Sequence, residues 1–155
     1  MRAADLFPWR HEVRAGTLAA VQNLPDVHLE WKPEGGVHSI MGWLRHIAQS
    51  EDWWIQSGVL GKHNFVPRRK TELADRDAVL RYLAETRAVT ESLLLEWPAE
   101  KLRETRPIPP GFRGAPRGPE VSLHWIMGNL FNHEIHHRAQ IYLYLRFMGV
   151  EPPLY

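Results

Sequence analysis

Residues 122–148 are SLHWIMGNLFNHEIHHRAQIYLYLRFM, the longest stretch of the chain in which apolar side chains recur at helical spacing. Gly149 follows directly, and Pro152 and Pro153 come soon after it. Glycine is favoured just after the last turn of a helix, and proline cannot continue one. The sequence therefore predicts a helix over about 122–148.

Three other segments combine helical spacing with residues that begin or end helices. They are about Asp5–Asn23, Ser39–Ser57 and Asp75–Trp97. Four amphipathic helices within 155 residues fit one domain over residues 1–155. The predicted fold class is all-α, a four-helix bundle with long crossover connections.

The segment Pro107–Pro119 contains five Pro and three Gly among its thirteen residues. Such a composition excludes a helix or a central strand. We expect a long crossover loop or an irregular flap over a site. No alternation of apolar and polar residues predicts a strand elsewhere in the chain.

The composition excludes several classes of protein. The chain has no Cys, which rules out disulfides, thiolate zinc sites and a Cys nucleophile. Its 19 Lys and Arg balance 18 Asp and Glu, so we expect neither a nucleic-acid nor a membrane partner. The basic residues Arg68, Arg69, Lys70, Arg113 and Arg117 are interpreted as solvated surface. Neither a signal peptide nor a long apolar run stands out, which predicts a cytoplasmic location.

The candidate chemistry lies with histidines. His133 and His137 are four residues apart, so their imidazoles lie one above the other on a helix face. That face is mostly apolar and should point into the bundle. Imidazoles in an apolar interior need partners, and either a metal ion or ordinary hydrogen bonds would serve.

A third histidine strengthens the metal interpretation. His46 shares a helix face with small residues and large aromatic residues, a mixture typical of a cavity wall. Three histidines from two helices would leave coordination positions open, as catalytic metals require. The alternative is that His46 is a hydrogen-bonded core residue. The residues expected to form a substrate pocket are Trp43, Ser50, Trp53, Asn129 and Tyr144.

The run His133–His137 also matches H-E-x-x-H, the zinc-protease motif in which the glutamate is the general base. Position 143, where one protease class has its third histidine, is Leu. Glu151, the acid that follows, lies beyond the predicted helix end. We therefore do not favour a protease, and we expect Glu134 to be a helix-surface group or a group behind the ligands. The same expectation holds for His136.

Four segments resemble the DinB-like (DinB/YfiT-type) family. They are GWLRHIA at 42–48, DWW at 52–54, HEIHHRAQI at 133–141 and LRFMGV at 145–150. The family pattern usually has Gly where this chain has Ala139. The resemblance extends from the first predicted helix to the C-terminus.

The resemblance implies a four-helix bundle in which His46, His133 and His137 hold a divalent metal. We expect this metal to be Zn or Ni. The resemblance also implies a homodimer and a small-molecule substrate. Members with known activity are thiol-dependent S-transferases and isomerases that use an external low-molecular-weight thiol. The expected function is therefore a metal-dependent thiol S-transferase, whose catalytic residues are not identified. The alternatives are a metal-dependent hydrolase and a non-catalytic, stress-linked protein that binds a metal or small ligand.

Overall fold

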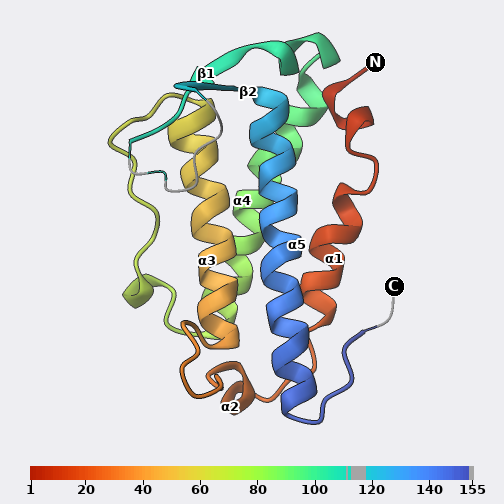
Figure 1. Cartoon of the computed structure of the whole chain (residues 1–155), viewed down its shortest axis with the longest axis vertical. Coiled ribbons are helices and arrows are strands. Elements are labelled where there is room, and N and C mark those ends of the chain that lie inside the picture. The colour runs from red at the N-terminus through yellow and green to blue at the C-terminus, as the bar shows by residue number, and fades with distance from the viewer. Residues whose placement is uncertain (111, 113–117, 154–155) are drawn as a thin grey trace.

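The long helices of the computed structural model run alongside one another (Figure 1). They are α1 (Arg10–Ala19), α3 (Ile40–Trp53), α4 (Arg76–Glu96) and α5 (Leu123–Phe147). Helix α3 contacts both α4 and α5, and α1 contacts α5. The structure describes residues 1–110, 112 and 118–153. This part of the chain is mostly helical, as predicted.

Side chains cap three of these helices at the predicted positions. Ser39, Asp75 and Ser122 precede α3, α4 and α5, and each accepts a hydrogen bond from the backbone N–H three residues later, at 2.8–3.1 Å. These bonds satisfy amides of the first turn that lack a helical partner. Gly149 follows α5 with a φ of +73°, a conformation that glycine adopts without strain. The predicted bounds of α4 and α5 are therefore correct to within one residue at each end.

The first helix is shorter than predicted. Ala3–Leu6 form a 3₁₀-helix, and α1 begins only at Arg10. Pro8 lacks a backbone N–H and disfavours the helical region for the residue before it. Phe7 accordingly has φ −129° and ψ 60°, which interrupts the helix.

The second predicted helix changes character near its end. Helix α3 stops at Trp53, and Trp54–Val59 continue as a π-helix. Gly58 lies against the indole ring of Trp54, where an added Cβ would come within 2.7 Å of Cε3. The close approach of this ring to the backbone therefore requires a glycine.

A small sheet, which the sequence analysis did not predict, flanks the proline-rich connection. Strand β1 (Thr105–Pro107) pairs in antiparallel fashion with β2 (Glu120–Ser122). Three residues per strand are too few for a recognisable alternation. The remaining short helices, absent from the sequence prediction, are α2 (Asp26–Leu29), Lys70–Glu72 and Ala99–Arg103. Arg113 and Arg117 lie outside the described residues.

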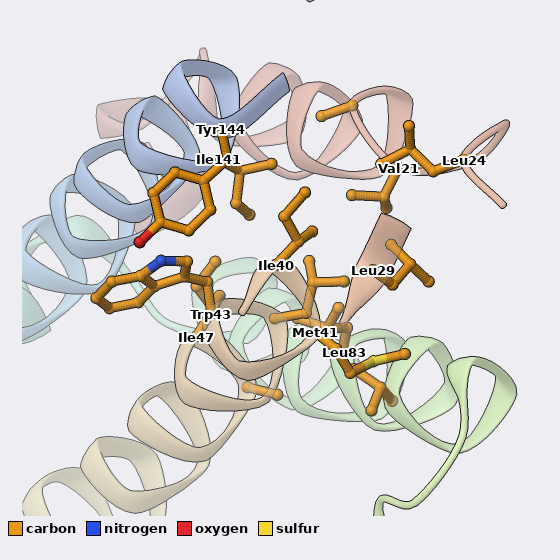
Figure 2. Close-up of a cluster of buried hydrophobic side chains, with 14 of the residues drawn as sticks. Val21, Leu24, Leu29, Ile40, Met41, Trp43, Ile47, Leu83, Ile141 and Tyr144 are labelled. Atoms are coloured by element: carbon orange, nitrogen blue, oxygen red, sulfur yellow. The ribbon is translucent and has the colours of Figure 1, made fainter. Parts of the chain in front are cut away.

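The buried apolar side chains form two clusters at different levels of α5. One cluster includes buried residues of α5 between Leu123 and Phe131. The other includes the α5 residues Ile141, Tyr144 and Leu145. Figure 2 shows part of the second cluster, with Tyr144 and Trp43 among its members. His133 and His137 fall between the two clusters along the helix. In the described part of the chain, no helix combines the length and apolarity needed to cross a bilayer.

Candidate metal centre

Helices α3 and α5 bring three histidines together. His46 comes from α3, and His133 and His137 come from successive turns of α5. The Nε2 atom of His133 lies 3.1 Å from Nε2 of His46 and 3.0 Å from Nε2 of His137. One ring nitrogen from each histidine lies within 4.8 Å of the others, so the three could hold a divalent metal.

The environment keeps these imidazoles neutral. Burial, reinforced by the neighbouring His137, lowers the pKa of His133 to about 3 and that of His46 to about 4. Burial lowers the pKa of His137 as well. A neutral imidazole retains a nitrogen lone pair, and the lone pair is what binds a metal.

Two contacts fix the orientation of His137. Its Nδ1 lies 2.6 Å from Oε1 of Gln140, an oxygen that can only accept a hydrogen bond. Nδ1 therefore carries the proton, and the lone pair is on Nε2, which faces His133. The indole of Trp43 stacks on the same ring, with the centroids 4.5 Å apart and the planes at 20°.

A pocket of about 550 Å³ adjoins His46 and His133. Of the residues predicted to form a substrate pocket, Ser50, Trp53 and Asn129 line it. Trp43 and Tyr144 do not, because Trp43 stacks on His137 and Tyr144 packs edge-on against Trp31. The remaining lining residues, which the sequence analysis did not identify, are Gln49, Trp54, Pro67 and Phe112. We refer to this as the aromatic pocket.

A second pocket of about 380 Å³ shares His46 and Gln49 with the aromatic pocket. His38 also lines it and stacks near His46, with the ring centroids 5.8 Å apart. His136, by contrast, is exposed on α5 although its ring lies 4.9 Å from that of His137. His136 is therefore a surface residue beside the histidine cluster.

Glu134 lies in the protein interior, which corrects its predicted place on the helix surface. Its carboxylate accepts hydrogen bonds from Arg14 Nε at 2.8 Å and from Arg87 Nη2 at 2.6 Å. Burial alone would raise its pKa, but the two guanidinium groups lower it. A carboxylate engaged in this way cannot serve as the general base of a protease at the histidines. The protease interpretation of H-E-x-x-H is therefore contradicted.

Glu134 belongs to a buried ion cluster that takes one residue from each long helix. Its members are Arg14, Glu51, Arg87 and Glu134. Arg14 Nη2 lies 2.7 Å from Glu51 Oε2, and Arg87 Nε lies 2.8 Å from Glu51 Oε1. Thr90 also donates to Glu51, at 2.7 Å. The sequence analysis missed this cluster, although Arg87 shares a helix face with the buried residues Leu83 and Leu94. A charged residue on an apolar helix face is the sequence feature that could have indicated a buried ion pair.

Comparisons with known proteins agree with this architecture. The model of the DinB family matches residues 1–155. A DinB-like protein from Bacillus cereus is similar over 97% of this chain and 94% of its own, at 20% identity and a TM-score of 0.61. A DinB-like protein from Bacillus subtilis is similar over 93% of this chain and 96% of its own, at 18% identity and a TM-score of 0.61. No protein of curated function matches the chain. Since the family model covers its whole length, the chain belongs to the DinB family.

Proposed function

We propose that the protein binds one divalent cation through Nε2 of His46, His133 and His137 and catalyses a metal-dependent thiol transfer. The observation that carries the proposal is the convergence of three neutral imidazoles beside a pocket of about 550 Å³. In this proposal the four long helices form a four-helix bundle around the site. Zinc and nickel are the expected metals, because both accept imidazole ligands.

The donor set suits a catalytic metal. Three protein ligands leave further coordination positions for a substrate. Because the ligands are neutral, they would not offset the charge of the cation, and the nearby carboxylate of Glu134 is engaged by Arg14 and Arg87. A bound divalent cation would therefore stabilise the thiolate form of a thiol near neutral pH.

The aromatic pocket suits the other reactant. Trp53, Trp54 and Phe112 offer apolar surface for an electrophilic substrate. Ser50 and Asn129 offer hydrogen-bonding groups that can orient it. The thiol must come from outside the protein, since the chain has no Cys.

Elemental analysis of tag-free protein tests the metal site. We expect about one equivalent of metal per chain in the wild type and its loss in His46→Ala and His137→Ala. His136→Ala is the matched control, because His136 is exposed on the same helix, and it should keep its metal. A wild-type protein that takes up no ion on reloading would refute the site.

A thiol-transfer assay then tests the reaction. The metal-loaded protein is incubated with an electrophile such as 1-chloro-2,4-dinitrobenzene and a range of small thiols. We expect product formation that requires the metal and is lost in His46→Ala. Ester hydrolysis without thiol dependence would instead favour a hydrolase. A metal that affects only the free energy of unfolding would favour a non-catalytic binding protein.

A further inference from the structure

The second pocket differs from the aromatic pocket in its charge. Lys32, Arg45 and Lys70 line it together with Glu30, so positive charge predominates. The whole chain carries a formal charge of only +1. The positive charge of this pocket is therefore a local feature, and we call it the cationic pocket.

Contacts with the protein hold part of this charge in place. Arg45 is buried, and its Nε donates to the carbonyl oxygen of Leu73 at 2.8 Å. Its Nη2 lies 3.6 Å from a carboxylate oxygen of Glu30, a side chain that is 58% exposed. Lys32 donates to the carbonyl oxygen of Gly36 at 3.2 Å. Glu30, which also accepts a hydrogen bond from Ser39 Oγ at 3.3 Å, offsets part of the charge, and the lining side chains stay net positive.

The backbone adds to the same potential. Ser39 and Gly42, at the start of α3, also line the cationic pocket. The N-terminus of a helix carries a partial positive charge from its aligned peptide dipoles. This charge adds to that of the side chains and favours an anion in the pocket.

His46 and Gln49 connect the two pockets, since both residues line both of them. His46 therefore borders aromatic side chains in one pocket and cationic side chains in the other. A ligand with an anionic end and a reactive or apolar end can occupy both pockets across the histidine cluster. Neither pocket alone satisfies both kinds of group.

We propose that the cationic pocket is an oxyanion subsite, in which Lys32, Lys70 and Arg45 bind a carboxylate or phosphate group of the small-molecule ligand. The proposal rests on the proposed function, because the ligand reaches from this subsite to the histidine cluster. Lys32 and Lys70 are exposed and provide flexible point charges. Arg45 is held in place by its backbone contacts.

A pair of three-carbon thiols, one with a carboxylate and one with a hydroxyl at its end, tests the subsite. Calorimetry measures the binding of 3-mercaptopropionate and 3-mercaptopropan-1-ol to zinc-loaded protein at low ionic strength. We expect the carboxylate thiol to bind about tenfold more tightly. The Lys32→Glu/Lys70→Glu variant should lose that difference. The control Lys62→Glu/Lys101→Glu changes the same charge at residues outside both pockets and should retain it.

The outcomes separate this inference from the proposed function. Equal binding of the two thiols, or a preference that survives in Lys32→Glu/Lys70→Glu, overturns the subsite but leaves metal-dependent thiol binding in place. If neither thiol binds, the proposed function fails, and an NMR titration with propionate and with inorganic phosphate decides the subsite alone. Binding of either anion that is lost in the variant supports the subsite and identifies the preferred oxyanion. Binding of neither overturns it.

Discussion

The histidine cluster and the ion cluster both take residues from α3 and α5, yet their ionisable side chains have different partners. His46 and Glu51 are five residues apart on α3, and Glu134 lies between His133 and His137 in the sequence of α5. Burial lowers the pKa values of the histidines, whose Nε2 atoms lie close to one another. The pKa of Glu134 is lowered because the guanidinium groups of Arg14 and Arg87 contact its carboxylate. The first arrangement can accept a ligand, whereas the second is complete without one.

Each charged side chain of the ion cluster has several partners, which offset the desolvation of the buried charges. Arg14 donates hydrogen bonds to the carboxylates of Glu51 and Glu134 and to the carbonyl oxygen of Leu83. Glu51 accepts from Thr90 in addition to both arginines. Buried charges are tolerated when every polar atom has a partner, and removing one partner exposes the full desolvation cost of the rest. The two clusters should therefore respond differently to mutation.

The largest effect is expected when the ion cluster is broken. Glu134→Gln removes the charge that Arg14 and Arg87 share, and it should destabilise the protein by about 3–5 kcal/mol. Urea denaturation measures the free energy of unfolding. Glu85→Gln, at an exposed ion pair with Arg68, should change it little. Equal effects of the two substitutions would show that the ion cluster is not a stability element.

A smaller effect is expected when the histidine cluster loses its orienting contact. Gln140→Ala removes the acceptor for Nδ1 of His137 and should weaken metal binding about 10–100-fold. Competition with a chromophoric chelator measures the affinity. The free energy of unfolding of the metal-free protein should change much less. Gln22→Ala, at an exposed position, is the control and should bind metal normally.

The smallest effect concerns pH and separates the clusters by their titration ranges. The folded pKa values of His46 and His133, about 4 and about 3, lie below the ordinary value near 6.5. Between these values the unfolded chain binds more protons, so the metal-free protein loses stability as the pH falls below about 6.5. The pKa of Glu134 is also lowered, so its contribution is lost only below about pH 4.3, the ordinary glutamate value.

Thermal denaturation of metal-free protein at pH 7 and pH 5 checks this assignment. The melting temperature should fall between the two values, and the fall should be smaller in His46→Ala/His133→Ala. A fall of the same size in the double variant would assign the pH dependence to other groups.

Local signals were sufficient to predict α4 and α5, because their caps and terminating residues lie within a few positions of the helix ends. They failed at the first helix, because Pro8 disfavours the helical conformation for Phe7 and α1 begins only at Arg10. The prediction that three histidines meet depended on spacing and on resemblance. In the structure one ring nitrogen from each histidine lies within 4.8 Å of the others. Glu134 was misplaced because its partners Arg14 and Arg87 are distant in sequence, and local pattern carries no record of such pairing.

The aromatic pocket shows the same limit of prediction from local sequence. Ser50, Trp53 and Asn129 line it and lie on the helices that carry the histidines. Pro67 and Phe112 come from connections whose path depends on tertiary packing. Trp43 and Tyr144 were expected in the pocket on helical spacing alone, yet they face His137 and Trp31. Spacing identifies a face of a helix, but it does not say which neighbour occupies that face.

The π-helix at Trp54–Val59 has a consequence for how this pocket can evolve. A π-helical turn holds more residues than an α-helical one, so a single-residue deletion within it can restore regular α-helix. Trp54 lies within the π-helix and lines the aromatic pocket, so such a deletion would reshape the wall to which it contributes. His46 and Glu51 precede the π-helix and would keep their positions. A single codon could thus alter which substrates fit, while the histidine and ion clusters are inherited unchanged.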